Sequence, residues 1–440
     1  MLSSRLPKDL SPSQFFAELE RVKACAKKDA AEGGLSFIDM TVSSPVKAGL
    51  PIDLDAAVEE TRKDFGCWNP DAAGWKSARE AVVEYYRERG GNFTAGQIIL
   101  TASTSEAYSV LFKTFCDPGD VILTPMPGYP LLDTLAQLEH LECAPYFLKI
   151  RRENARKLAT DERRKGTSFR FVLDTDSLLA APERAKILLL VSPHNPTGHC
   201  VSREEWNAAV RFCEENDMIL VIDEVFGDYA FSDKVQRSWQ YVLAPCHPEQ
   251  NEEESKDLWD AGGGDFINLP EGGPKCPIFW LNGLSKAVGS PQLKLGWMAF
   301  YAPRERFEEI RAALEFVEDA YLSVSAPAQA LGTSLLPKAA AYEAQVKERL
   351  LRNWQTLREA FPSKYCPEVL GGWYAVVRLG EDDEELTLRL LKEKHVLVQP
   401  GFFFDFDEDG WVVVSLLQEP AQFKEAISRI RVGDPRSSRG

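Results

Sequence analysis

Short apolar segments alternate with segments of helical periodicity through the middle of the chain, from Gln97 to about Tyr301. Each apolar segment is almost uniformly hydrophobic for four or five residues, which is typical of strands buried on both faces. Amphipathic segments such as 105–114 and 204–215 separate them and predict helices. This alternation predicts an α/β fold with a mainly parallel central sheet covered by helices. The predicted strands lie at residues 98–101, 121–124 (ended by Pro125), 187–191, 218–222, 278–281 and 297–300.

The pattern changes after about Glu305, where longer amphipathic segments predict helices and shorter apolar segments predict strands. The predicted helices are 304–317, 339–360, 385–393 and 421–431, and the predicted strands are 373–378, 396–398 and 411–415. We therefore expect a second, smaller α+β domain. The expected organisation is an N-terminal arm at 1–55 that contributes to the small domain, a large domain at 56–304, and the small domain at 305–440.

Composition narrows the classes of function. The 440 residues suffice for two domains and a large core. The formal net charge of −16 argues against nucleic acid as a partner, because phosphates would be repelled. The sequence contains no apolar run of transmembrane length, and its N-terminus lacks the continuous apolar stretch of a signal peptide. The nine cysteines form no Cys-x-x-Cys pair and the five histidines lack the spacing of metal ligands, so we expect a cytoplasmic protein without a metal site.

Polar motifs follow three of the predicted strands. An Asn-Pro-Thr-Gly turn begins at Asn195, Asp223 ends one apolar segment, and Ser285-Lys286 follow another. In a mainly parallel sheet, ligands bind beyond the carboxyl ends of the strands, so these motifs are expected to share one site. Pyridoxal 5'-phosphate (PLP) requires an amine for a Schiff base, a carboxylate that keeps its pyridine nitrogen protonated, and a donor near its phenolic oxygen. Lys286, Asp223 and Asn195 can supply these groups.

In this order, the motifs resemble those of PLP-dependent aminotransferases of fold type I, class I/II, from about Asp39 to about Arg431. The resemblance implies that Lys286 carries the cofactor and that Asp223 pairs with its pyridine nitrogen. It also implies a PLP-dependent transaminase that exchanges an amino group between a small amino donor and a keto acceptor by a ping-pong mechanism. The family works as a homodimer with its site at the subunit interface, so a homodimer is expected.

The resemblance also implies cofactor-binding residues outside the three motifs. The segment 101–106 reads Thr-Ala-Ser-Thr-Ser-Glu between a strand and a helix, and Ser103 with Glu106 fits a capping box. A helix N-terminus with free amides also suits a phosphate. Tyr129, in a Pro-Gly-Tyr-Pro turn, is expected to stack on the cofactor ring. The implied cofactor-binding residues are Ser103, Thr104, Ser105, Tyr129, Asn195, Asp223, Ser285, Lys286 and Lys294.

Three positions depart from the family's pattern. Phe226 stands where a tyrosine is usual, which removes a hydroxyl directed at the phenolic oxygen. Lys294 stands where an arginine is usual, and a lysine pairs with phosphate only as a point charge. Val413 stands where a carboxylate-binding arginine is expected. Carboxylate recognition must then come from Arg378, Lys47 or backbone amides, or else the substrate is not an ordinary α-amino acid.

Other readings of this chain stay open at this point. A PLP-dependent lyase or decarboxylase would share the fold and the cofactor. A non-catalytic relative that binds PLP or a protein partner would account for the departures at Phe226 and Val413. The three phenylalanines at 402–404 either line an apolar substrate wall or belong to the core.

Two stretches look inserted relative to the family. Residues 151–171 are rich in arginine and lysine, and residues from about 232 to 277 are rich in acidic residues, glycine and proline. The composition of the second stretch predicts an excursion over the surface.

Overall fold

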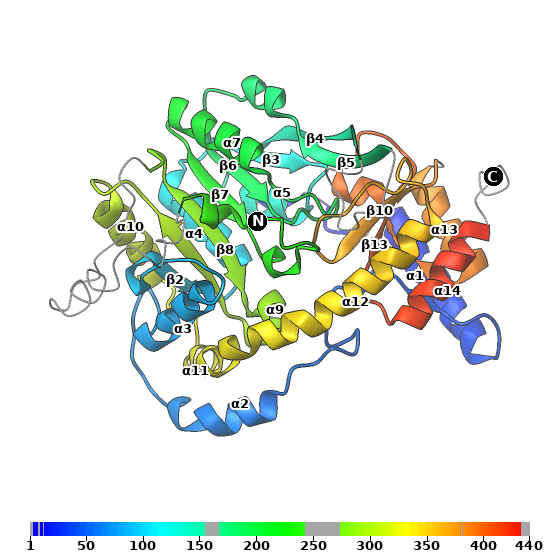
Figure 1. The fold of residues 1–440 in the computed structure, drawn as a ribbon, viewed down its shortest axis with the longest axis horizontal. Coiled ribbons are helices and arrows are strands. Elements are labelled where there is room, and N and C mark those ends of the chain that lie inside the picture. The colour runs from blue at the N-terminus through cyan, green and yellow to red at the C-terminus, as the bar shows by residue number, and fades with distance from the viewer. Residues whose placement is uncertain are drawn as a thin grey trace.

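The computed structural model describes residues 3–7, 9–11, 13–154, 167–242, 273–380 and 382–432. Within them, an eight-stranded sheet forms the centre of the larger part of the molecule, and a three-stranded sheet belongs to the smaller part (Figure 1). The helices are α1 (Gln14–Ala31), α2 (Leu54–Thr61), α3 (Lys76–Arg87), α4 (Thr104–Phe115), α5 (Leu131–Leu138), α7 (Arg203–Glu215), α9 (Leu284–Ala287), α10 (Phe307–Asp319), α11 (Ala326–Leu335), α12 (Ala339–Ala360), α13 (Asp383–Lys394) and α14 (Pro420–Val432).

The large sheet is mainly parallel, as its apolar strands predict. Its order is β2 (Ile98–Thr101), β9 (Gly296–Tyr301), β8 (Ile278–Gly283), β7 (Ile219–Asp223), β6 (Ala185–Val191), β3 (Val121–Met126), β4 (Glu142–Asn154) and β5 (Thr167–Leu173). The five central strands, from β8 to β4, pair in parallel. The pairs β2–β9, β8–β9 and β4–β5 are antiparallel. The sequence-based prediction of the fold class is therefore confirmed.

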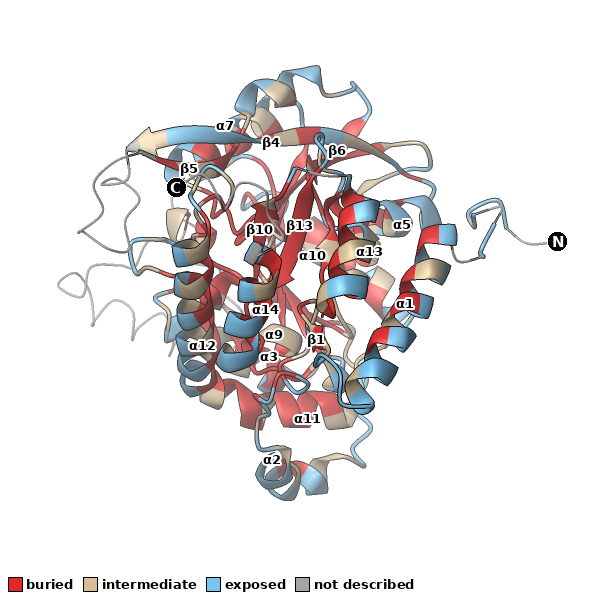
Figure 2. Ribbon diagram, turned by 90° about the vertical axis from the view of Figure 1, so that its right-hand side faces the viewer, coloured by how far each residue is buried: buried red, intermediate tan, exposed pale blue. Residues whose placement is uncertain are grey.

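Helices cover both faces of this sheet, because successive strand residues point to opposite sides. In β6, Ile187 and Leu189 pack into a core with α4, α5 and α10. Leu188 and Leu190 pack into the other core, which includes residues of α3 and α7. Central strands such as β6 are accordingly almost entirely buried, whereas much of β4 is exposed (Figure 2). Residues between 307 and 319, just past the expected large domain, thus lie over the large sheet.

The smaller part contains a sheet ordered β10 (Tyr374–Arg378), β13 (Trp411–Ser415) and β12 (Gln399–Pro400), with all neighbours antiparallel. A separate pair joins β1 (Ile38–Asp39) to β11 (Val396–Leu397) in parallel. Helix α1 packs its apolar residues against α13 and turns its polar side to solvent (Figure 2). The N-terminal segment is therefore attached to the C-terminal part of the chain by both a helix and a strand.

Residue-level differences from the expected elements have local causes. Strand β3 does not end at Pro125 but continues to Met126. The register of β3 with β6 stops at Leu123, so the missing N–H of the proline breaks no ladder on that side. Strands β4 and β5 were not predicted. They pair as a long antiparallel ribbon that takes in the described ends of the basic stretch 151–171, whereas residues 155–166 lie outside the described part.

The prediction that residues from about 232 to 277 form an excursion over the surface is partly wrong. Residues 243–272 lie outside the described part of the chain. Residues 232–242, however, are not all on the surface, because the Trp239 side chain is fully buried. Arg237 also forms ion pairs with Glu224 at 3.0 Å and Asp228 at 2.8 Å. This segment therefore belongs to the core beside β7, although its polar composition resembles that of a loop.

Candidate active site

Strand register brings the predicted site residues to one edge of the large sheet. Asp223 pairs with Leu281 of β8, two residues before Gly283. Gly283 pairs with Gly296 of β9, and Gly296 pairs with Thr101 of β2. The segments that follow these strand ends carry Lys286 in α9 and the serine–threonine segment 103–105 at the start of α4. The carboxyl ends of β2, β7 and β8 therefore meet, as expected for a ligand site.

Lys286 lies in an aromatic enclosure. Its Nζ is 4.8 Å from the ring centroid of Trp373 and 5.5 Å from that of Phe226. The hydroxyl of Tyr229 donates to the backbone carbonyl of Lys286 at 2.6 Å, which fixes the start of the side chain. Burial lowers the pKa of the Lys286 amine to about 8, and the negative charge of Asp223 opposes the shift. A substantial fraction of the amine is therefore neutral and nucleophilic near neutral pH.

Asp223 has a tyrosine partner that the sequence reading missed. The Tyr108 hydroxyl donates to Asp223 Oδ2 at 2.6 Å, and the Val225 N–H donates to Oδ1 at 3.0 Å. Burial raises the pKa of Asp223, while these two hydrogen bonds and the charge of Lys286 act in the opposite direction. The available signal was helical spacing: Tyr108 lies four residues after Thr104 and so shares its helix face. A buried carboxylate in this setting can hold a cationic ring nitrogen.

The start of α4 is arranged as expected, except that only half of the predicted capping box forms. Ser103 is the N-cap, and its hydroxyl accepts the Glu106 N–H at 3.2 Å. The Glu106 carboxylate does not accept the Ser103 N–H, as a full capping box requires, but accepts the Ala102 N–H and the Ser323 hydroxyl instead. Thr104 and Ser105 are half-buried at the first turn of the helix. The free amides and hydroxyls of this twelve-residue helix suit a phosphate.

Two glycines allow the strands that carry these groups to approach closely. A Cβ on Gly296 would lie 3.1 Å from the Ser103 carbonyl carbon, and a Cβ on Gly283 would lie 3.0 Å from the Gly296 Cα. Lys294 precedes this contact by two residues in a left-handed conformation with φ 54°. Its side chain is exposed and forms no hydrogen bond or ion pair with the described residues. Lys294 is thus near the start of α4 and available to an anion.

Tyr129 and Asn195 follow β3 and β6, which are neighbours in the large sheet. The pKa of Tyr129 is raised by burial and then by the negative charge of Asp223. The Gly128 N–H donates to the Phe404 carbonyl at 2.8 Å and anchors this turn to the smaller part. The side-chain oxygen of Asn195 is buried and has no hydrogen-bond partner in the described part of the chain. This oxygen can only accept, but rotation of the amide by 180° would place its NH2 group there, where it could donate to a ligand oxygen.

Several expected substrate contacts lie elsewhere. Phe402 and Phe403 pack against Phe15 of α1, with ring centroids 5.3 and 5.9 Å away, and Phe404 is buried in the core. They therefore support the arm and the core. Arg378 forms a 2.5 Å ion pair with Glu408. Val413 is fully buried, as an apolar side chain requires.

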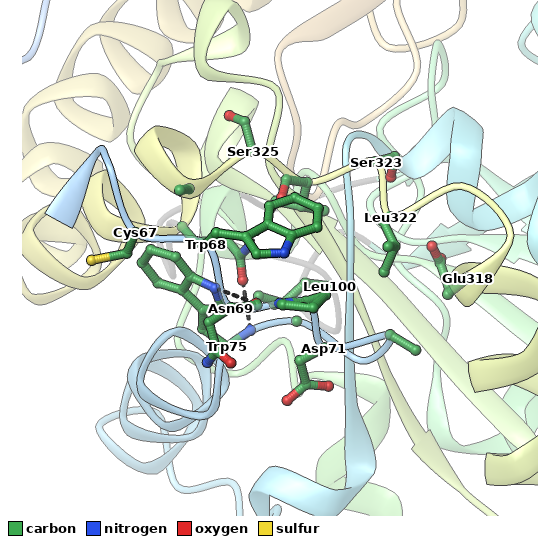
Figure 3. Close-up of a pocket in the computed structure, with 16 residues that line it drawn as sticks. Cys67, Trp68, Asn69, Asp71, Trp75, Leu100, Glu318, Leu322, Ser323 and Ser325 are labelled. Carbon is green, nitrogen blue, oxygen red and sulfur yellow. Dashed lines mark hydrogen bonds between the residues drawn. The ribbon is translucent and has the colours of Figure 1, made fainter.

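A pocket of about 110 Å³ lies behind the start of α4 (Figure 3). Trp68 and Trp75 border it, and Glu318 and Ser323 lie on its other side. Burial raises the pKa of Glu318 to about 8, and the charge of Glu106 adds to this shift. Within the described residues, no group of three or more histidine, cysteine or acidic side chains is arranged to hold a metal ion. This pocket is linked to α4 through the hydrogen bond from Ser323 to Glu106, and Lys286 does not line it.

The groups at the sheet edge match those that PLP needs. An amine with a lowered pKa faces a buried carboxylate, Asn195 follows the neighbouring strand β6 with its side-chain oxygen unpaired, and a helix N-terminus offers free donors. Fold and site together define a PLP-dependent enzyme of fold type I. The chain belongs to the class I and II aminotransferases, whose family model matches residues 55–430. It is a PLP-dependent transaminase.

Individual relatives are distant but cover most of the chain. It is 23% identical to glutamate-pyruvate aminotransferase AlaA of Haemophilus influenzae over 91% of both chains. It is 22% identical to a tyrosine aminotransferase of Caenorhabditis elegans, over 82% of this chain and 69% of that protein. An Escherichia coli aminotransferase structure superposes with a TM-score of 0.73 at 20% identity, covering 98% of this chain and 97% of that chain. Alanine aminotransferase from Pyrococcus furiosus superposes with a TM-score of 0.71 at 21% identity, covering 96% and 99% respectively.

Proposed function

We propose that this aminotransferase exchanges an amino group between a small amino acid and a keto acid in two half-reactions at the edge formed by β2, β7 and β8. The observation that carries the proposal is the Lys286 amine, whose pKa burial lowers to about 8 beside the Asp223 carboxylate. An amine that is partly neutral at physiological pH can hold a carbonyl cofactor covalently and can later move a proton. Bound PLP supplies the electron sink that stabilises a carbanion next to nitrogen.

We assign a role to each residue of the proposed site. Lys286 Nζ would hold the cofactor covalently and, once released, would accept the proton from the substrate carbon. Asp223, which is hydrogen-bonded by Tyr108, would keep the pyridine nitrogen protonated. Asn195 would donate to the phenolic oxygen, and Tyr129 would pack on the ring. The residues that would bind the phosphate are Ser103, Thr104, Ser105, Ser285 and Lys294.

The names of related proteins support the substrate class. Relatives are named glutamate-pyruvate, alanine and tyrosine aminotransferases. Their donors are ordinary amino acids and suggest 2-keto acids as acceptors here. The aromatic enclosure of Trp373 and Phe226 around Lys286 is compatible with small or aromatic side chains. We therefore propose alanine, glutamate and tyrosine as the first donors to test.

We further propose a cytoplasmic homodimer, with the arm at 1–55, the large domain at 56–304 and the small domain at 305–440. The attachment of α1 and β1 to the C-terminal part supports the assignment of the arm. None of the described helices combines the length and apolar composition needed to cross a bilayer. The described cysteines carry free thiols, which fits a reducing compartment. Trp68 is 82% exposed at the pocket of Figure 3, and Tyr321, which precedes Leu322 of the same pocket, is 57% exposed; such aromatic surface is typical of subunit contacts.

The proposed function is tested by following the visible absorption of the PLP-loaded protein. Each of the three donors is added, and the band of the covalently bound cofactor should bleach with at least one of them. Pyruvate or 2-oxoglutarate should then restore the band. Asp223→Asn should bind PLP but bleach orders of magnitude more slowly, since the pyridine nitrogen loses its anionic partner. A band that responds to no donor, or that bleaches without returning, would overturn the transaminase assignment for these substrates.

A further inference from the structure

One face of the three-stranded sheet is turned toward the site. The register of β10 on β13 puts Tyr374 and Trp411 on the same face, because residues two apart along a strand project to the same side. At one end of this face, the Tyr374 ring lies 6.0 Å from Phe226, whose own ring is 5.5 Å from Lys286 Nζ. At the other end, Trp411 lies 5.9 Å from Phe171 of β5. The face therefore looks onto the large sheet, and at one end it contacts Phe226, which itself lies beside the Lys286 amine.

Gln399 lies on this face between the two contacts. It pairs with Val413 in the β12–β13 register, and Val413 also pairs with Val376 of β10. Directly opposite residues of an antiparallel pair share a face, with Cβ atoms about 5 Å apart. The side-chain oxygen of Gln399 is buried and finds no hydrogen-bond partner among the described residues. Rotation of the amide by 180° would place its NH2 group at this position, where it could donate to a ligand oxygen. A buried polar group without a partner is costly unless a ligand completes it.

Lys286 is the cation that the contacts with Phe226 place near the Tyr374 end of this face. The pKa of Lys286 is set by burial and by Asp223, with no other charged group contributing. The pKa of Tyr374 is raised by burial and by Tyr129, and lowered by a hydrogen bond with the Ser43 side chain. Arg378 lies two residues further along the face from Val376 and is paired with Glu408. A carboxylate that enters here meets hydroxyls and an amide in place of a guanidinium.

We propose that Gln399 is a specificity-determining residue that hydrogen-bonds the carboxylate of the amino donor through its neutral amide. The inference rests on the proposed transaminase function and identifies the residue that recognises the carboxylate of the donor. A neutral amide gives a hydrogen bond without an ion pair, so the preference for an amino acid over its decarboxylated amine is modest, roughly 3- to 10-fold in kcat/KM. An enzyme with an arginine at this place would discriminate much more strongly.

The test compares two matched substrate pairs, L-alanine with ethylamine and L-tyrosine with tyramine, in single-turnover bleaching of the PLP-loaded protein. Gln399→Leu removes the amide at similar volume, and Gln399→Glu adds a negative charge at the same place. The readout is the amino acid to amine ratio of kcat/KM, because a general folding defect lowers both members of a pair alike. Gln422→Glu adds the same charge on the exposed side of α14 and serves as the control. Arg378→Ala tests the rival contact.

Gln399→Leu should lower the ratio about 3- to 10-fold, mainly through KM for the amino acid. Gln399→Glu should lower it further, since it repels a carboxylate and attracts an ammonium. Gln422→Glu and Arg378→Ala should leave it unchanged. An unchanged ratio in both Gln399 variants, or a loss of preference in Arg378→Ala alone, would overturn the inference while the wild type still transaminates. A wild type inert toward both members of both pairs, and toward glutamate as well, would instead overturn the proposed function and the inference with it.

Discussion

The chemistry proposed for Lys286 depends on where its amine lies, not on the residue type alone. An exposed lysine is almost fully protonated at neutral pH, whereas burial brings the pKa of Lys286 to about 8. Covalent capture of PLP by the apoprotein should therefore become faster with rising pH, by about tenfold per unit, and level off above about pH 8. Stopped-flow absorption measures this rate. Borohydride reduction and peptide mapping should place the pyridoxyl group on Lys286, and a label on any other lysine would contradict the site.

The hydrogen bond from Tyr108 gives a second prediction at this scale. Tyr108→Phe removes a 2.6 Å bond that favours the ionised form of Asp223. The pKa of Asp223 should rise, so the acid limb of the kcat profile should move to higher pH by roughly one unit or more. Tyr86→Phe serves as a control. It removes a buried hydroxyl that accepts a hydrogen bond from Trp297 and does not bond Asp223, so the acid limb should stay in place. If both variants share the wild-type limb, Tyr108 does not act through Asp223.

The sequence identifies residues that belong to motifs and misses those placed by tertiary packing. Lys286, Asp223 and Asn195 follow strand ends in the expected order, and the structure brings them to one edge. Tyr108 was missed because helical spacing puts it on the face of Thr104 but does not show that this face of α4 meets Asp223 at the end of β7. Gln399 was missed for a similar reason: its position on the face near Lys286 is set by pairing with a strand that comes later in the chain.

Elements are predicted best where a single burial pattern, uniform in a strand or periodic in a helix, runs along their whole length. The strands at 98–101 and 411–415 and the helix at 339–360 were predicted with the bounds that the structure gives, and the others differ by one to three residues. Strand β4 was missed because its outer half is exposed and charged like a loop, and β5 pairs with that half. Residues 232–242 were wrongly predicted to lie on the surface for the same reason, because Arg237 is buried among carboxylates and not in water. Composition thus fails where polar groups are paired inside the fold.

The position of Glu318 near the end of α10 gives a prediction about stability. Burial raises the pKa of Glu318 to about 8 from an ordinary value of 4.5, so the folded protein keeps this carboxyl protonated at neutral pH. Between pH 4.5 and 8 the unfolded chain ionises and the folded chain does not, so this group costs increasing stability as the pH rises. The cost is absent below about pH 4 and constant above about pH 8.

Glu318→Gln removes this cost and should raise the unfolding temperature at pH 8 by roughly 2–5 °C, with no gain at pH 4. Thermal unfolding followed by circular dichroism across this pH range checks the prediction. Glu315→Gln, on the same helix but paired with Arg311 at 2.8 Å near the surface, is the matched control. An equal gain at both pH values would show that the effect is packing and not ionisation.

At the scale of the whole molecule, the aromatic surface around the pocket of Figure 3 leads to a prediction about assembly. Trp68 and Leu322 both border that pocket, and Trp68 is 82% exposed in a single chain. If a second copy covers this surface, Trp68→Asp should shift the protein from dimer to monomer at micromolar concentration. Light scattering coupled to gel filtration measures the mass. Leu179→Asp is the control, since Leu179 is 81% exposed on another part of the chain, and a dimer that survives Trp68→Asp would place the interface elsewhere.

The pairing of β1 with β11 has a consequence for the nascent chain. Ile38 pairs with Val396, so the first strand to leave the ribosome waits for a partner about 360 residues later. At typical synthesis rates this delay is roughly 20–70 s. Throughout it, the apolar side of α1 with Phe15 and Leu19 has no Leu391 to cover it. The large sheet can form during translation, whereas the arm can pack in place only near the end of translation. A ribosome stalled before residue 390 therefore exposes the apolar side of α1 to chaperones.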